Sequence, residues 1–132
     1  MKDRLLLYSF VSVIVVASVN FVANFFYLYW TVWWFDNISH FLGGLSMGLL
    51  WFWAFNKLFR FVAESSFKNI LFIVLVLVLA VGVGWEIFEY IFDIANPTGF
   101  ETYWQDTAYD LIADTFGAVS ASLLIFKNRL YD

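Results

Sequence analysis

The 132-residue chain has no cysteine, one proline and one histidine, and only 14% of its residues are charged. The absence of cysteine excludes disulfide bonds, thiolate metal ligands and a thiol nucleophile. The only proline lies in Asn96-Pro97-Thr98-Gly99, a segment whose composition predicts a turn. A net charge of −4 argues against a nucleic-acid partner.

Hydrophobic residues make up 63% of the chain and aromatic residues 23%, whereas soluble domains are about 45–50% apolar. Four apolar stretches, at about 5–30, 37–59, 68–93 and 106–127, are long enough to cross a hydrocarbon core of ~30 Å. The first is too long for a cleaved signal peptide. We therefore predict an all-α, polytopic protein: one domain, 1–132, built as a bundle of four transmembrane helices whose short links make sequential helices antiparallel neighbours.

Positive charge is confined to the ends of these stretches. All seven basic residues lie beyond the apolar stretches or at their very ends: Lys2, Arg4, Lys57, Arg60, Lys68, Lys127 and Arg129. The positive-inside rule then predicts that both termini and the second link are cytoplasmic, as in a multi-pass protein of the inner (cytoplasmic) membrane. Eight acids fall on the opposite side or in the outer half of the spans: Asp36, Glu86, Glu89, Asp93, Glu101, Asp106, Asp110 and Asp114.

Polar groups on all four stretches share one depth. With ~1.5 Å of rise per residue, Asn24, His40, Glu86, Glu89, Asp110 and Asp114 lie roughly 5–12 Å below the outer helix ends. On each helix they share a narrow face, which predicts that they point into the bundle. The four carboxylates would cost on the order of 10 kcal/mol if they were ionised and unpaired. No basic residue is placed to neutralise them, so protons or a cation must do so.

A divalent metal ion is the favoured partner for these acids. Carboxylates with one imidazole suit Mg²⁺, Mn²⁺, Ca²⁺, Zn²⁺ or Fe²⁺. The predicted metal ligands are Glu86, Glu89, Asp110, Asp114 and His40. The predicted catalytic groups are His40 and Asp36, with Asp36 orienting His40 or with His40 acting as general base.

Simpler structural roles compete with these predictions. Asp36 and Asp106 each precede or begin an apolar stretch and suit helix N-caps. His40 could form an ordinary interfacial hydrogen bond, and Asn20 and Asn24 could join helices through their amides. Gly44 and Gly48 form a G-x-x-x-G motif that suits either packing within the bundle or a homodimer face.

Two segments repeat a pattern. The second and fourth stretches share a spacing of polar and small residues: Asp36-x-x-x-His40-x-x-Gly43-Gly44 and Asp110-x-x-x-Asp114-x-x-Gly117-Ala118. This shared spacing predicts two helical hairpins related by a pseudo-two-fold axis along the membrane normal, with the site between them.

These motifs, with Trp85-Glu86-x-x-Glu89, resemble the YjdF-like small inner-membrane proteins. More loosely they resemble VanZ-like proteins, whose pattern has an asparagine where this chain has Asp114. The resemblance covers the second to fourth stretches. It implies a polytopic bundle; the YjdF-like family implies no settled activity, and the VanZ-like one implies a link to glycopeptide resistance and the cell envelope.

The leading functional hypothesis is a metal-dependent hydrolase or transferase that acts at the outer leaflet on a lipid or lipid-linked substrate. A proton- or cation-coupled transporter or channel is an alternative, although few polar groups (Ser12, Ser46, Ser120 and Ser122) continue a path through the inner half. A non-catalytic protein that binds a basic helix or a cationic ligand is a third. The sequence leaves the substrate, the reaction, the ion and the oligomeric state open.

Overall fold

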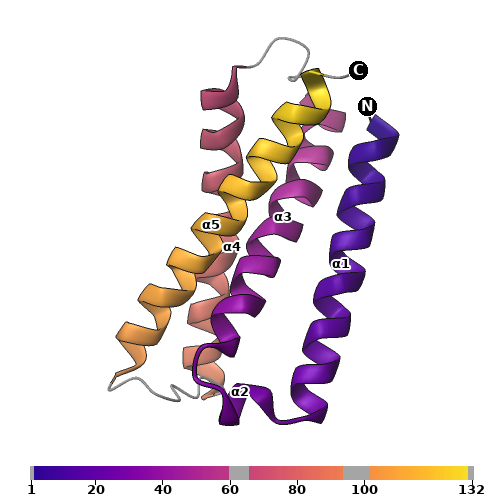
Figure 1. The fold of residues 1–132 in the computed structure, drawn as a ribbon. Helices are drawn as coiled ribbons and strands as arrows, with labels where there is room; N and C mark the ends of the chain where they lie inside the picture. The colour runs from indigo at the N-terminus through magenta and orange to yellow at the C-terminus, as the bar shows by residue number, and fades with distance from the viewer. Residues whose placement is uncertain (1, 60–65, 94–101, 131–132) are drawn as a thin grey trace.

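The computed structural model describes residues 2–59, 66–93 and 102–130, and these form helices without strands. The helices are α1 (Lys2–Phe25), α2 (Leu28–Thr31), α3 (Phe35–Phe59), α4 (Phe67–Phe92) and α5 (Tyr103–Leu130). All but α2 are long and apolar enough to cross a membrane. The predicted all-α fold with four transmembrane helices is confirmed, and the chain's two ends lie at the same end of the bundle (Figure 1).

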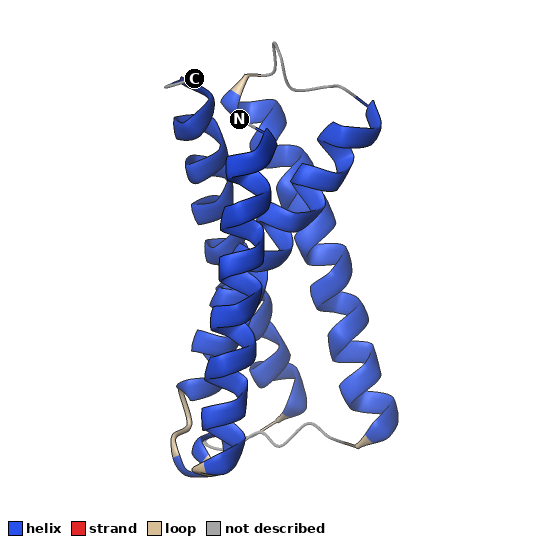
Figure 2. Ribbon diagram, turned by 90° about the vertical axis from the view of Figure 1, so that its right-hand side faces the viewer, coloured by secondary structure: helices blue, strands red, loops and turns tan. Residues whose placement is uncertain are grey.

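We call the end that carries both termini the basic end, because Arg4, Lys57, Lys68 and Lys127 lie there. The opposite end, where α3 and α5 begin and α4 finishes, is the acidic end. Figure 2 shows the bundle from the side, with its long helices running between these two ends. The predicted turn at 96–99 lies outside the described residues.

The first transmembrane helix is shorter than the predicted 5–30. The α-helix α1 ends at Phe25, and Tyr27 adopts a left-handed conformation with φ 57°. Tyr27 N–H bonds to Asn24 O at 3.3 Å, three residues back rather than four, so the α-helical ladder is interrupted. The short helix α2 follows, and it folds the chain back over the acidic end.

The last helix begins earlier than predicted. It starts at Tyr103, and the Thr102 hydroxyl accepts a hydrogen bond from Gln105 N–H at 3.4 Å, as an N-cap does. Asp106 is therefore the fourth residue of α5 and is buried, so its interpretation as the N-cap is wrong. Asp36 is the second residue of α3 and lies inside its first turn.

Three helices bury stripes in which every fourth residue points inward. The stripes are His40, Gly44, Gly48, Phe52 and Asn56 on α3; Ile70, Val74, Val78, Gly82 and Glu86 on α4; and Asp106, Asp110, Asp114, Ala118 and Ser122 on α5. Rows at i±4 form the ridges that pack into grooves of neighbouring helices. Each stripe has its ionisable residues toward the acidic end and is otherwise mostly small or apolar.

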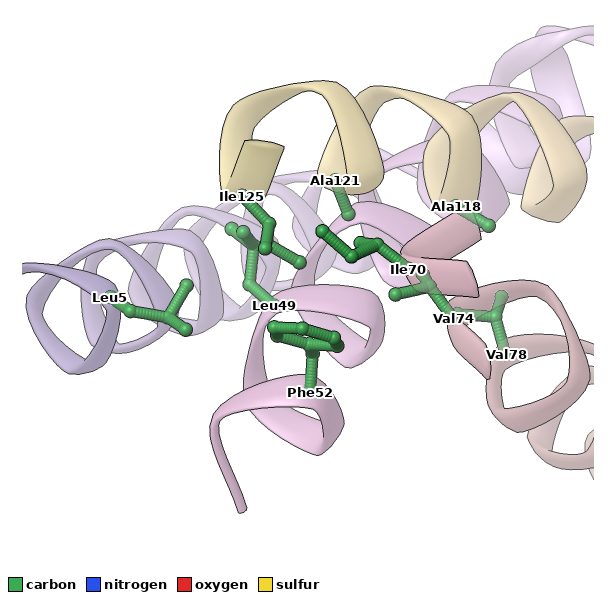
Figure 3. Packing of buried hydrophobic residues seen from close by; sticks show 9 residues of the cluster. All are labelled: Leu5, Leu49, Phe52, Ile70, Val74, Val78, Ala118, Ala121 and Ile125. Atoms are coloured by element: carbon green, nitrogen blue, oxygen red, sulfur yellow. The ribbon is translucent and has the colours of Figure 1, made fainter. Parts of the chain in front are cut away.

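The apolar core occupies the part of the bundle toward the basic end. Its buried members are Leu5, Leu49, Phe52, Ile70, Val74, Val78, Ala118, Ala121 and Ile125, drawn from all four long helices (Figure 3). Val74 and Ile70 are fully buried. This core fixes the helices relative to one another beside the ionisable residues.

Glycines allow α3 and α5 to touch. A Cβ atom at Gly44 would lie 2.5 Å from the backbone oxygen of Asp114, and one at Gly117 would collide with the backbone of Phe41. A Cβ at Gly48 would lie 2.7 Å from the Ala121 Cβ. The G-x-x-x-G motif therefore faces a partner within this chain. The pseudo-two-fold relation of the two hairpins stays a prediction.

Candidate functional site

The only histidine of the chain is surrounded by three carboxylates at the acidic end. His40 Nε2 lies 3.9 Å from Asp36 Oδ1 and 3.8 Å from Asp110 Oδ2. His40 Nδ1 lies 3.6 Å from Asp114 Oδ1. Helix α3 supplies the imidazole and one carboxylate at (i, i+4) spacing, and α5 supplies two carboxylates at the same spacing, because one helical turn brings such residues to one face.

The two ring nitrogens face different partners. Nε2 faces Asp36 and Asp110, and Asp36, His40 and Asp110 each offer a ligand atom within 4.8 Å of the others. Both separations from Nε2 exceed the 2.7–3.2 Å of a direct N–H···O hydrogen bond. They are close to the separation, about 3–3.5 Å, between adjacent ligand atoms that each lie 2.0–2.2 Å from one metal ion. The donor set therefore fits a hard or borderline divalent ion after a small contraction.

Within this group, Asp110 is the carboxylate whose hydrogen-bonding capacity is least used. It is 2% exposed, and its Oδ1 atom has no hydrogen-bond partner among the described residues. A buried carboxylate oxygen without a partner costs free energy comparable to a lost hydrogen bond, and more if the group is charged. Asp110 is thus the residue that would gain most from a bound cation or proton.

Asp114 lies on the side of the ring away from that ligand group. Its Oδ2 atom sits against Gly82 of α4, where a Cβ atom would collide with it. The absence of a side chain at Gly82 thus makes the space for the Asp114 carboxylate. On Nδ1, Asp114 occupies the position of a carboxylate that fixes a histidine's tautomer and ring orientation.

Glu86 is buried but belongs to a separate polar contact between α4 and α5. Its Oε2 atom accepts a hydrogen bond from Thr107 Oγ1 at 2.6 Å and a longer one from the Tyr103 hydroxyl at 3.4 Å. The Tyr103 hydroxyl also donates to the Glu86 backbone oxygen at 2.5 Å. The other carboxylate oxygen, Oε1, has no partner among the described residues. The structure does not bring Glu86 into the group around His40.

Replacing Thr107 by valine is expected to destabilise the protein. Thr107→Val keeps the side-chain volume but removes the shortest hydrogen bond to the buried Glu86 carboxylate, at an expected cost of about 1–3 kcal/mol. Thermal unfolding in detergent measures this loss. Thr115→Val is the matched control, because the Thr115 hydroxyl bonds only to Leu111 O of its own helix at 2.8 Å. Equal destabilisation in both variants would refute a special role for the Glu86 contact.

Glu89 lies one turn beyond Glu86 and is half-buried. Its Oε1 atom accepts a hydrogen bond from Trp85 Nε1 at 2.8 Å. Asp93 ends α4 in a left-handed conformation with φ 53° and is exposed, so it does not join the buried acids. Of the five predicted metal ligands, the structure gathers His40, Asp110 and Asp114, and it adds Asp36.

A cavity of about 470 Å³ opens beside the histidine. Its walls come from α1 and α4 on the two sides, with α3 behind, and residues of α2 and α5 at the acidic end. His40, Asp36 and Asp114 all line it. Helix α1 packs on α3 and α2 rather than on α4, so the two side walls are not closed against each other. The cavity therefore opens between α1 and α4.

A hydrogen-bond network holds α2 across one end of the cavity. The Tyr29 hydroxyl donates to Asn20 Oδ1 of α1 and lies 2.8 Å from Ser39 Oγ of α3. Burial raises the pKa of the Tyr29 phenol above its usual value, so the hydroxyl remains protonated and able to donate. Asn20 was predicted to join helices through its amide, and it does so by accepting the hydrogen bond from Tyr29. Asn24 instead bonds to the Asn20 backbone oxygen at 2.9 Å.

Sequence reasoning missed four residues of this region: Tyr29, Ser39, Tyr103 and Thr107. The residues that flank Tyr29 and Tyr103 in the sequence predict no polar role for either side chain. Thr107 follows Glu86 by 21 residues. It is one residue after the acid Asp106 and three before Asp110. Its position about one helical turn before the buried Asp110 was the available signal.

The fold and the site together define a polytopic four-helix membrane protein with a buried group of one histidine and several aspartates. A family model described as "Predicted membrane protein (DUF2238)" matches residues 4–129. The chain therefore belongs to this family, which is the YjdF-like family, and the stated resemblance is confirmed. The looser VanZ-like resemblance finds no support. Comparison with curated proteins and with solved structures gave no match.

Proposed function

We propose that this protein binds a divalent metal ion near the outer face of the membrane and uses it as an enzyme on a lipid or lipid-linked substrate. The observation that carries the proposal is the convergence of Asp36, His40 and Asp110 to within 4.8 Å, with a buried Asp110 oxygen that has no partner in the described part of the chain. A metal there supplies Lewis-acid chemistry for hydrolysis or group transfer.

The chain's own residues have distinct parts in this proposal. Asp36, Asp110 and His40 Nε2 hold the ion. Asp114, whose Oδ1 atom lies 3.6 Å from Nδ1, is the carboxylate that orients the ring so that Nε2 faces the ion. This assignment exchanges the predicted parts of Asp36 and Asp114. Glu86 and Glu89 stand outside the set, Glu89 on the cavity wall and Glu86 bonded to Thr107.

The cavity supports a lipid substrate. Polar side chains line the cavity around His40, and the cavity opens between α1 and α4. If that opening faces the bilayer, a lipid can reach the site without leaving the membrane. The positive-inside rule places the basic end in the cytoplasm and the site near the outer leaflet of the inner membrane.

The hydroxyl groups toward the basic end favour this proposal over transport. Ser9, Ser12, Ser120 and Ser122 each donate to a backbone oxygen of their own helix at 2.8–2.9 Å. Hydroxyl protons committed in this way are not available to extend a proton relay. Ser46 is the exception, because its buried Oγ atom has no hydrogen-bond partner among the described residues.

The metal content of purified protein tests the proposal. Protein isolated in a neutral detergent is expected to carry about one divalent ion per chain by elemental mass spectrometry, and the ion should be removed by chelation. Turnover of lipids from a membrane extract is expected to stop on chelation and return with the ion. Wild-type protein without stoichiometric metal after reloading would refute the metal site, and turnover that survives complete chelation would refute its catalytic use.

A further inference from the structure

Carboxyl groups dominate the ionisable lining of the cavity beside His40. Four acids line it, namely Asp36, Glu89, Asp106 and Asp114, and its lining includes no lysine or arginine among the described residues. Behind His40 lies Asp110, nearly fully buried and with an unpartnered oxygen. A single divalent ion would neutralise only part of this charge. Electrostatics therefore favour a ligand that brings positive charge into the cavity.

Aromatic side chains line the same cavity. Trp30, Trp33 and Trp85 are about half exposed, and all three contribute to the lining. Trp85 also holds the Glu89 carboxylate through its indole N–H at 2.8 Å. Indole faces next to a carboxylate form the environment in which proteins bind ammonium groups, because the ring quadrupole and the carboxylate both attract a cation.

The rest of the lining is apolar. Val16 of α1, Met47 of α3, and Val78 and Val81 of α4 lie nearer the middle of the bundle than the acids. Val81 is 38% exposed, so this part of the cavity is open to the outside of the bundle. An alkyl chain can occupy this part of the cavity while a polar head stays at the level of His40.

We infer that the cavity binds an amphiphile with an ammonium head group and an alkyl chain. The ammonium group lies against Glu89 and the tryptophans, and the chain extends along the apolar residues toward the gap between α1 and α4. As the substrate class of the proposed enzyme, this inference rests on the proposed function. A phospholipid with an amine head group and a free cationic amphiphile share this chemistry.

Binding of two single-chain probes tests the inference. Decyltrimethylammonium and decanesulfonate have the same chain length and opposite charge, and calorimetry can compare them below their micellar concentrations on chelator-treated protein in a neutral detergent. The cationic probe is expected to bind at least about tenfold more tightly. Because no metal is present, the result does not depend on the metal site. Equal affinities, or tighter binding of the sulfonate, would overturn the inference.

Two variants locate the ammonium group. Glu89→Gln keeps an acceptor for Trp85 but removes the charge, and it is expected to weaken the cationic probe about tenfold. Asp93→Asn is the matched control. It removes an acid four residues further along, outside the cavity lining, at a left-handed position that asparagine tolerates. A Glu89→Gln variant that binds like wild type, or an equal loss in Asp93→Asn, would refute the assignment.

A second binding experiment, with phospholipids, distinguishes a membrane lipid from a free cationic amphiphile as the ligand. Protein taken from bilayers with equal amounts of phosphatidylethanolamine and phosphatidylglycerol is analysed by native mass spectrometry. Retention of phosphatidylethanolamine that is lost in Glu89→Gln assigns the ligand to lipid, whereas selective binding of decyltrimethylammonium alone assigns it to a free cationic amphiphile. Preferential retention of phosphatidylglycerol would contradict the inference. Selective probe binding by a protein that never loads metal would refute the metal enzyme and leave the cavity assignment standing.

Discussion

Gly44→Ala is expected to be among the most damaging single substitutions in this protein. The added Cβ would lie 2.5 Å from the backbone oxygen and 2.9 Å from the Cα of Asp114. A backbone cannot rotate away as a side chain can, so α3 and α5 would have to separate. Overpacking of this kind costs about 1–3 kcal/mol. The separation would also move the Asp114 carboxylate away from His40.

Thermal unfolding in detergent and metal affinity together measure this effect. We expect Gly44→Ala to lower both the melting temperature and the metal affinity. Gly43→Ala is the matched control, because a Cβ at this neighbouring position in α3 would meet nothing within 4 Å. If the two variants unfold at the same temperature, the close contact between α3 and α5 is not as described.

Asp110→Asn and Asp114→Asn are expected to differ in how much metal affinity they lose. Asp110 faces Nε2 with the ligand group, so its replacement removes a charged ligand from the ion. Asparagine at 114 keeps an oxygen that can accept a hydrogen bond from Nδ1–H, and loss of such an orienting carboxylate costs about 10–100-fold. We therefore expect Asp110→Asn to lose more than 100-fold, and metal titration of purified variants measures both.

Glu86→Gln serves as the control for this pair. It also removes a buried acid, but one that is bonded to Thr107 and Tyr103 rather than close to His40. Its metal affinity is expected to stay within a few fold of wild type. If Asp114→Asn loses as much affinity as Asp110→Asn, Asp114 is itself a ligand. If Glu86→Gln loses as much, the ion lies between α4 and α5 instead.

The sequence predicts the four transmembrane helices because their signal is local. Each stretch must be long and apolar to cross a bilayer, and this requirement can be seen within a single window of residues. The break after Phe25 could not be seen in this way. It depends on Tyr29 reaching back to Asn20 and across to Ser39, contacts that exist only once α1, α2 and α3 are packed.

The candidate site was predicted in part. Depth and helical periodicity identify His40, Asp110 and Asp114 as buried neighbours, because both follow from the rise and rotation per residue. The same reasoning placed Glu86 and Glu89 with them. It could not tell that α4 is rotated so that Glu86 meets Thr107 of α5. The contact between Glu89 and Trp85 lies within α4 at (i, i+4) spacing and does not depend on this rotation.

The sequence by itself determined the class of protein, its family and the level at which its acids lie, since hydropathy, motif and helical rise are properties of one helix at a time. Only the tertiary structure decided which acids share the histidine. That choice depends on the rotation and separation of neighbouring helices, which Gly44, Gly117 and Gly82 set by letting backbones and the Asp114 side chain approach closely. A deviation of one helix by a fraction of a turn would leave the sequence pattern intact and bring different carboxylates to His40.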